Sequence, residues 1–410
     1  MYVVTTYGRE TCVASKKKLP SHWHSIAVRG GRRPHLYQGL VNPPIYHGST
    51  VLFESLALLE EARRNPFGRT FYGRMGTPTI FALEEGVACL YGEDKKGVAT
   101  CSGLSAIACV LLAYVRAGDT ILVADNVYEP TRRFCKTYLT QFGVKTIFYP
   151  PTAGDDIVAS MDDHVRLIFM ESPGSLTFEV QDVPTITSIA RARNIMTVID
   201  NTWAGALYFN PFEHGVDITI EAATKYITGH ADAMLGVVIC NPCDFKRIKS
   251  AVVAFGNAPG PDACYFGQRG LRSLAVRMPQ HEENALTLAS WLKAHPDVRL
   301  VLHPALDSCP GHALWQRDFS GSSGLFAFTL EDRGKKALAS MVDGMTFFGL
   351  GYSWGGYESL IMPSDAHKER RFPPAFVGQD VLIRLHAGLE SVDDLLADLE
   401  RGLQRYRATS

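Results

Sequence analysis

Met196-Thr-Val-Ile-Asp200-Asn-Thr-Trp203 and Ile220-Glu-Ala-Ala-Thr-Lys225-Tyr226 are two short apolar runs, and each leads into a charged side chain. Apolar runs of this length are typical of strands that are buried on both faces of a sheet. A carboxylate or an ammonium group is costly at such a position unless it is paired or used. Ligands of parallel sheets bind beyond the carboxyl ends of the strands. Asp200 and Lys225 therefore predict an α/β sheet with a chemical site along that edge.

The same alternation extends through the middle of the chain. Apolar strands are expected at 97–101, 120–124, 145–149, 167–171, 196–200, 217–221 and 233–240, with helices between them, for example at 105–116, 130–142 and 183–193. Strands that alternate with helices form a mostly parallel sheet with helices on both faces. The predicted fold class is α/β, with a large, mostly parallel seven-stranded sheet domain and a smaller C-terminal α/β domain.

Composition divides the chain into three parts. Residues 1–75 are rich in Gly, Pro, His and Arg without strong periodicity, so we expect an N-terminal arm there. Thr77-Pro78 has the residues that begin a helix, and the α/β domain is expected over 76–271. The smaller domain is expected over 272–410, and its last helix should start near Ser391.

Bulk properties argue against several classes of function. The 410 residues are 46% hydrophobic and carry a formal net charge of −1, which gives no electrostatic reason to bind nucleic acid or an anionic membrane. The longest uninterrupted apolar run, Ala106 to Val115, has ten residues and is too short to span a bilayer. We expect a cytoplasmic protein, with a basic leader as the alternative for residues 1–18.

Cysteine usage predicts neither a disulfide framework nor a metal site. The chain has nine cysteines, too few for its size to suggest a disulfide-stapled fold. Only Cys240-Asn-Pro-Cys243 has the spacing of a metal-ligand pair, and neither Cys264 nor Cys309 has a suitably spaced Cys or His beside it. We expect no metal, and interpret Cys240-Asn-Pro-Cys243 as a strand end that runs into a proline turn.

Four features at predicted strand ends suit a planar ligand that carries a phosphate, and each has an ordinary alternative. Cys101-Ser-Gly-Leu-Ser105 opens an apolar helix, and its free amides suit a phosphate or simply start the helix. Tyr128 could stack on a ring or merely pack. Asp200 is a partner for a protonated pyridine nitrogen or a cap for the next turn. Lys225 is a desolvated nucleophile or a lysine that reaches solvent. Together they point to pyridoxal phosphate (PLP).

Five ordered blocks resemble the Cys/Met-metabolism family of fold-type I PLP-dependent enzymes over most of the chain. They are Phe71-Tyr-Gly-Arg-Met-Gly-Thr-Pro-Thr79, Glu171-Ser-Pro-Gly174, Ile199-Asp-Asn-Thr-Trp203, Ala223-Thr-Lys-Tyr226 and Ser353-Trp-Gly-Gly-Tyr-Glu-Ser359. The resemblance implies that Lys225 carries PLP as a Schiff base, that Asp200 pairs with the pyridine nitrogen and that Tyr128 stacks on the ring. It implies further that the amides of Gly103 and Leu104 and the Thr224 hydroxyl hold the phosphate.

The resemblance also implies a second subunit and a substrate site. In this family Tyr72 and Arg74 reach the phosphate of the neighbouring subunit, which predicts a homo-oligomer, at least a dimer and commonly a homotetramer, contacted by the N-terminal arm. Arg384, inside an apolar strand, would bind the α-carboxylate of an amino-acid substrate as a bidentate pair. Ser353, Trp354, Tyr352 and Tyr72 would complete the substrate site.

The segment before the paired glycines indicates the reaction. Family members that act at the γ-carbon usually have Glu and then Ser-Leu there, whereas Tyr352-Ser353-Trp354 resembles the family's β-lyases. The expected reaction is β-elimination of L-cystathionine, a thioether, to homocysteine, pyruvate and ammonia, with Lys225 and Tyr128 as catalytic residues that move protons. The alternatives are a cystathionine γ-lyase, a broad cysteine S-conjugate or cystine lyase, and a non-catalytic regulatory protein with the PLP fold.

Two departures from the family pattern stand out. Ala222 occupies a position where many relatives carry a phosphate-binding Ser, which predicts slightly altered phosphate contacts. The loop from Ala366 to Pro374 is unusually charged, and the sequence alone gives it no mechanistic role.

Overall fold

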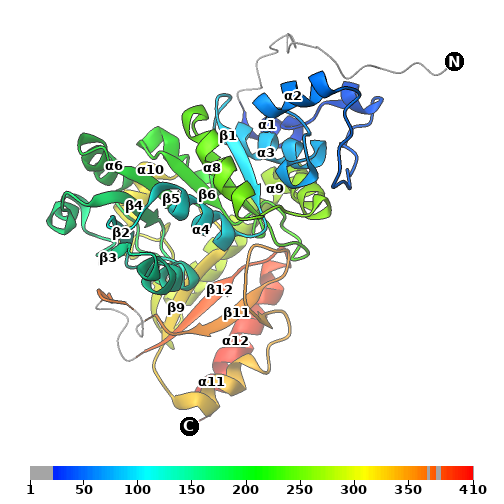
Figure 1. Cartoon of the computed structure of the whole chain (residues 1–410). Coiled ribbons are helices and arrows are strands. Elements are labelled where there is room, and N and C mark those ends of the chain that lie inside the picture. The colour runs from blue at the N-terminus through cyan, green and yellow to red at the C-terminus, as the bar shows by residue number, and fades with distance from the viewer. Residues whose placement is uncertain (1–21, 367–369, 375–379, 410) are drawn as a thin grey trace.

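The computed structural model describes residues 22–366, 370–374 and 380–409, and within them the chain builds two sheets. In Figure 1 the larger sheet, in cyan and green, lies above the smaller one, whose strands run from yellow to red. The larger sheet consists of β1 (Lys96–Thr100), β2 (Thr120–Ala124), β3 (Lys145–Tyr149), β4 (Val165–Glu171), β5 (Met196–Asp200), β6 (Ile218–Glu221) and β7 (Gly236–Cys240).

The strand order β1-β7-β6-β5-β4-β2-β3 confirms the predicted seven-stranded, mostly parallel sheet. All pairs from β6 to β3 are parallel, and β7 alone runs antiparallel to both of its neighbours. A parallel connection needs a crossover, usually a helix. Residues 222–235, which join β6 to β7, form turns instead, so β7 returns beside β6 in the opposite direction.

Helices cover both faces of this sheet, as its continuously buried strands require. Strands β2, β6 and β7 are buried along their whole length. The helices of this region are α3 (Pro78–Tyr91), α4 (Gly103–Tyr114), α5 (Glu129–Arg133), α6 (Val183–Ala192), α7 (Gly205–Tyr208), α8 (Pro242–Ala254) and α9 (Pro261–Ala294). The helix expected at 130–142 is divided, because α5 continues into a π-helical turn, Phe134–Leu139. Short 3-10 turns lie at Gly154–Ser160 and Pro211–His214.

The smaller sheet has the order β10-β11-β12-β9-β8 and a core of its own. Its elements are β8 (Val298–Leu302), α10 (His312–Asp318), β9 (Leu325–Leu330), α11 (Gly334–Val342), β10 (Gly349–Leu350), β11 (Leu360–Ser364), β12 (Val381–His386) and α12 (Val392–Ala408). Helix α12 begins directly after Ser391, as predicted, and buries Leu395, Leu399 and Leu403 against this sheet. The spacing of four residues places these leucines on one helix face.

The N-terminal region contains α1 (Trp23–Arg29), α2 (Leu56–Arg64) and 3-10 turns at Pro34–Tyr37 and Gly73–Met75, drawn in blue in Figure 1. Helix α1 packs on α3 and α9. The 34-residue helix α9 also contacts β8 and β9 of the smaller sheet, so it joins both halves of the molecule. The predicted boundary at residue 271 falls inside α9, and the three-part division stays a prediction. Throughout the described ranges, each helix is too short or too polar to cross a membrane.

Candidate active site

The residues predicted to hold the cofactor within one chain lie at or just beyond the ends of strands β1, β2, β5 and β6: Gly103, Leu104, Tyr128, Asp200, Thr224 and Lys225. Asp200 is the last residue of β5 and stands in register with Ile220 on β6 and with Glu171 on β4. Lys225 follows β6 in the turn that leads to β7. Because neighbouring parallel strands end at the same edge, residues far apart in the sequence share one surface there.

The N-terminus of α4 offers unpaired amides at this edge. Ser102 caps the helix, since its hydroxyl accepts a hydrogen bond from the Ser105 amide and the Ser105 hydroxyl accepts one from the Ser102 amide. This capping box leaves the amides of Gly103 and Leu104 without an intrahelical acceptor. A Cβ on Gly103 would lie 2.6 Å from the Ala222 Cβ, so glycine here lets the helix end approach the segment before Lys225.

Thr202 donates hydrogen bonds to Asp200 and also contacts Ala222, so it links the end of β5 to the segment that leads to Lys225. Asp200 Oδ1 accepts hydrogen bonds from the Thr202 amide, at 3.0 Å, and from its hydroxyl, at 2.5 Å. The same hydroxyl accepts a hydrogen bond from the Ala222 amide at 2.8 Å. Burial raises the pKa of Asp200, while the Thr202 hydrogen bonds and the positive charge of Lys225 oppose this shift.

Lys225 contacts Ser353, which lies in the turn before β11 of the smaller sheet. Its Nζ donates a hydrogen bond to Ser353 Oγ at 2.6 Å and lies 5.0 Å from the centroid of the Trp354 ring. Burial, and then the positive charge of the nearby Arg384, lower the pKa of Lys225 to about 8, while Asp200 opposes the shift. An amine with this pKa is partly neutral near pH 7, which is the form that acts as a nucleophile.

Arg384 reaches the same residue from β12. One guanidinium nitrogen donates to the Ser353 carbonyl at 3.0 Å, and Tyr128 and Tyr352 lie close enough to interact with it electrostatically. Burial lowers the pKa of Arg384. Among the described residues no carboxylate pairs with this guanidinium, so its remaining donors are available to an anionic ligand.

Tyr128 and Glu171 form a second contact at this edge. The Tyr128 amide donates to Glu171 Oε2 at 2.7 Å, and the Tyr128 ring is half-buried. Burial, and then the charges of Glu171 and Asp200, raise the pKa of Tyr128. The pKa of Glu171 is raised well above its usual value by burial and by Asp200 on the next strand. The sequence reasoning missed Glu171, although its place at the end of β4 was the available signal.

Three predicted residues have other contacts in this chain. The Thr224 hydroxyl donates to the Leu235 carbonyl and accepts from the Leu235 amide, so it would have to leave that carbonyl to donate to a phosphate. Arg74 donates to the Val253 carbonyl at 2.5 Å and lies over the Tyr72 ring. Within the part of the chain that the structure describes, neither Tyr72 nor Arg74 contacts Lys225 or Asp200.

Residues 370–372 of the charged loop contact the larger sheet region, and residues 367–369 lie outside the described ranges. The Arg370 guanidinium is buried between two carboxylates, 2.7 Å from Glu179 Oε1 and 3.6 Å from Asp125 Oδ2. Asp125 also pairs with buried Arg132 and accepts hydrogen bonds from the amides of Arg371 and Phe372. The loop charges therefore hold residues 370–372 against the segment that leads to Tyr128.

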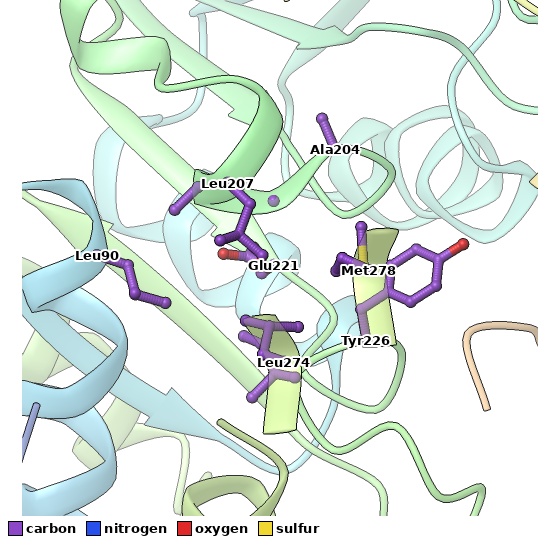
Figure 2. Close-up of a pocket in the computed structure, with 10 residues that line it drawn as sticks. Leu90, Ala204, Leu207, Glu221, Tyr226, Leu274 and Met278 are labelled. Carbon is purple, nitrogen blue, oxygen red and sulfur yellow. The ribbon is translucent and has the colours of Figure 1, made fainter. Parts of the chain in front are cut away.

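A small cavity lies beside Tyr226, and none of the predicted site residues lines it. Figure 2 shows its apolar wall, formed mainly by Leu90, Leu207, Leu274 and Met278, with Glu221 and Tyr226 at its side. Its volume of about 10 Å³ has room for one water molecule at most. Over the described residues, no group of three or more His, Cys, Asp and Glu side chains is arranged to hold a metal ion.

Comparison with known proteins identifies the family. The Cys/Met metabolism PLP-dependent enzyme family matches residues 24–404. Cystathionine beta-lyase MetC of Escherichia coli (strain K12) is 41% identical over 92% of this chain and 97% of its own, and the L-alanine/L-glutamate racemase of Wolbachia pipientis wMel is 36% identical over 93% and 96%. A solved cystathionine gamma synthase of Xanthomonas oryzae pv. oryzae, in complex with aminoacrylate and cysteine, has a TM-score of 0.86 and 31% identity over 95% of this chain and 100% of its own. The chain belongs to the Cys/Met metabolism family of PLP-dependent enzymes, and the fold-type I prediction is confirmed.

Proposed function

We propose that this chain is a cystathionine β-lyase, which cleaves the Cβ–S bond of L-cystathionine to give homocysteine, pyruvate and ammonia. The observation that carries the proposal is the junction at Ser353, where Lys225 binds the hydroxyl and Arg384 binds the carbonyl. A lysine for covalent chemistry and an arginine for a carboxylate are thereby set at a fixed separation. An α-amino acid presents its amino group and its carboxylate at a similarly fixed separation.

The residues at the strand edge fit PLP. Lys225 has a lowered pKa, Asp200 is a partly buried carboxylate, and the α4 N-terminus has free amides beside Ala222. In this proposal Lys225 attaches the cofactor, Asp200 pairs with the ring nitrogen, Tyr128 stacks on the ring, and the Gly103 and Leu104 amides hold the phosphate, with Thr224 as a further donor. When bound, PLP supplies an electron sink that stabilises negative charge at the substrate Cα.

Arg384 binds and orients the substrate carboxylate. Its guanidinium is partly buried, donates to the Ser353 carbonyl and has no acidic partner among the described residues. A substrate carboxylate would therefore accept hydrogen bonds from N–H groups that have no acidic partner in this chain. A bidentate pair of this kind fixes the direction of the Cα–H bond as well as adding affinity. Ser353 and Trp354 line the same place through their backbone.

Lys225 and Tyr128 move the protons. With a pKa of about 8, Lys225 Nζ has a neutral fraction that can remove the Cα proton near pH 7. The thiolate that leaves Cβ needs a proton, which Lys225 or Tyr128 supplies. Burial keeps the Tyr128 phenol protonated by raising its pKa, and a protonated phenol is the form that can donate.

The aromatic pair around Ser353 favours β-elimination. Tyr352 is 89% exposed, whereas Trp354 packs between Lys225 and Tyr226, whose ring centroid is 5.4 Å away. A carboxylate at either position could bind a distal amino group of a substrate, and this chain has none there. The Tyr352-Ser353-Trp354 segment instead resembles that of the family's β-lyases, and this resemblance supports a β-lyase over a γ-lyase.

The proposal includes a cytoplasmic homo-oligomer, a dimer or tetramer. Tyr72 and Arg74 lie away from the Lys225 of their own chain, and apolar side chains of the N-terminal region are exposed, among them Val41, Leu52 and Leu56. A neighbouring subunit would cover these side chains and receive Tyr72 and Arg74 at its own phosphate site. Tyr72 would also contact substrate there.

Product analysis tests the proposal. The purified PLP-loaded protein should convert L-cystathionine to pyruvate and homocysteine in equal amounts. Formation of 2-oxobutyrate would indicate a γ-lyase, and racemisation of L-alanine without pyruvate formation would indicate a racemase. In a Lys225→Ala variant the activity should disappear; if this variant still held PLP fixed by borohydride and still made pyruvate, the role of Lys225 would be wrong.

A further inference from the structure

Arg384 and His386 leave the same face of β12, because alternate residues of a strand point to the same side. Both side chains contact the same turn, Ser353–Gly356. The Arg384 guanidinium donates to the Ser353 carbonyl at 3.0 Å, and the Gly355 amide donates to His386 Nε2 at 3.1 Å. One strand thus binds this turn at two points, and the turn carries the Ser353 hydroxyl that accepts from Lys225.

The turn has little freedom of its own. Ser353 has φ of 76° and Gly355 has φ of 85°, both in the region that favours glycine. A Cβ on Gly355 would lie 3.0 Å from the Lys225 Cα, so the turn lies directly against the backbone of the lysine. A displacement of the Gly355 peptide would therefore move Ser353 relative to both Lys225 and Arg384.

The His386 ring is buried and held on several sides. Its side chain is 0% exposed, and its centroid lies 5.2 Å from that of His281 and 6.0 Å from that of Tyr226. The His281 ring is anchored by the Ala387 carbonyl, which lies 2.8 Å from its Nδ1. Burial lowers the pKa of His386 to about 3, so the ring is neutral at physiological pH.

Two contacts with the turn meet at one ring nitrogen, Nε2. The Gly355 amide can only donate and its hydrogen points at Nε2, so this contact selects the tautomer in which Nε2 accepts. The Gly356 carbonyl, 3.1 Å from the same nitrogen, would accept from the other tautomer, and Nδ1 has no partner among the described residues. The neutral ring thus presents an acceptor to the turn, a role that a side chain without an acceptor at that point could not fill.

We infer that His386 is a positioning residue for substrate binding, which fixes the Ser353–Gly356 turn by accepting the Gly355 hydrogen bond and so sets Arg384 against the substrate carboxylate. The inference rests on the proposed function for the identity of the substrate. It assigns no proton transfer to His386, whose ring is separated from Lys225 by the turn itself.

The test compares two amides of different length. Gln at position 386 can place Oε1 near the position of Nε2, whereas the oxygen of Asn ends one atom earlier. In the PLP-loaded enzyme, His386→Asn should raise KM for L-cystathionine by about tenfold, with kcat changed less than about threefold, as loss of one buried acceptor predicts. By calorimetry, the Kd of 3-(ethylthio)propanoate, a thioether carboxylate without an amino group, should rise by a similar factor. His386→Gln should stay within about threefold of the wild type in both.

A matched control is His303→Asn, which alters another buried histidine whose Nε2 lacks a partner among the described residues. It should leave KM and Kd unchanged. Wild-type probe affinity in His386→Asn, equal losses in the Asn and Gln variants, or no probe binding by the wild-type enzyme would each overturn the inference. If the wild-type enzyme binds the probe but makes no pyruvate from cystathionine, the proposed function fails while the carboxylate site and its dependence on His386 can still be measured.

Discussion

Glu171 and Asp200 are register partners on neighbouring strands, yet their environments differ. Asp200 accepts two hydrogen bonds from Thr202 and lies near the positive charge of Lys225, whereas Glu171 accepts one from the Tyr128 amide. Two adjacent carboxyl groups in a partly buried place do not both ionise readily. The pKa of Glu171 is raised well above its usual value by burial and by Asp200, so of the two carboxyl groups Glu171 is the one that binds a proton more readily.

The raised pKa of Glu171 predicts that its amide can replace it. Glu171→Gln should keep kcat/KM within about threefold of the wild type, because an amide oxygen can still accept from Tyr128. Glu171→Leu should lower kcat/KM about tenfold, since the Tyr128 amide then lacks its acceptor. Steady-state kinetics with cystathionine measure both variants, and an equal loss in the two would show that the site needs a charged carboxylate.

Lys225 makes the cofactor-free protein sensitive to pH. Burial disfavours the ammonium form, so its folded pKa, about 8, lies below the ordinary 10.5 of the unfolded chain. Between these pH values only the unfolded chain retains the proton, and stability rises with pH across this window. The rate of covalent PLP capture should rise with a midpoint near pH 8.

Chemical denaturation of the cofactor-free protein from pH 7 to 10.5 measures the effect of Lys225 on stability. Subtracting the same profile for Lys225→Ala removes the contributions of other titrating groups. The wild type should gain stability relative to the variant as the pH rises through this range. Parallel profiles, together with a capture midpoint near 10, would contradict the lowered pKa.

The sequence predicted the main candidate site residues but not the residues that hold them in place. Lys225, Asp200 and Arg384 could be predicted because each is a charged group in or after an apolar strand. His386 and Glu171 act through contacts with Gly355 and Tyr128, which are 31 and 43 residues away in the chain. Local patterns do not contain such contacts, which arise only when two strand edges and the Ser353 turn come together.

At the scale of elements, the apolar runs predicted strands well where strand ends coincide with changes in polarity. β2, β3 and β5 have the predicted bounds. The strand expected at 233–240 begins only at Gly236, because the Leu235 backbone pairs with Thr224 rather than with a neighbouring strand. That contact depends on the return of the chain around Lys225, which no local pattern of hydrophobicity could show.

Residues 370–372 contact the larger sheet region through Arg370, which pairs with Glu179 and Asp125. Removing the cation in Arg370→Met should leave the buried Glu179 carboxylate with the Thr177 hydroxyl as its remaining side-chain partner among the described residues. Breaking a buried pair by deleting one partner costs about 3 kcal/mol or more, so the free energy of unfolding should fall by about that amount. Denaturant titration of the PLP-loaded enzyme measures the change.

Arg371→Met is the matched control for this prediction, because the Arg371 side chain is exposed and only its amide contacts Asp125. This variant should stay within about 0.5 kcal/mol of the wild type. A double variant, Arg370→Met with Glu179→Leu, should recover much of the loss, since it removes the uncompensated charge. Equal stability of Arg370→Met and Arg371→Met would show that the Arg370 ion pairs do not stabilise the fold.

At the scale of the whole molecule, the candidate site combines both sheets. Lys225 and Asp200 come from the larger sheet, whereas Arg384 and the Ser353 turn come from the smaller one. Tyr72 and Arg74 belong to a third region, and in this chain they contact each other and Val253 rather than the site. If Tyr72 and Arg74 bind at the site of a neighbouring subunit, each active site is built from two chains. A substitution in one chain can then be complemented by the intact residue of the other chain.

Subunit mixing tests this arrangement. Lys225→Ala and Arg74→Ala homo-oligomers should each be almost inactive, because each site lacks either its lysine or its phosphate contact. After denaturation and refolding of an equimolar mixture, about a quarter of all sites should combine intact residues from both chains, as random pairing in a two-fold dimer requires. Pyruvate formation should then recover to about a quarter of the wild-type rate, while the separately refolded variants stay inactive. No recovery in a mixture shown by mass spectrometry to contain hybrid oligomers would mean that Arg74 serves its own chain.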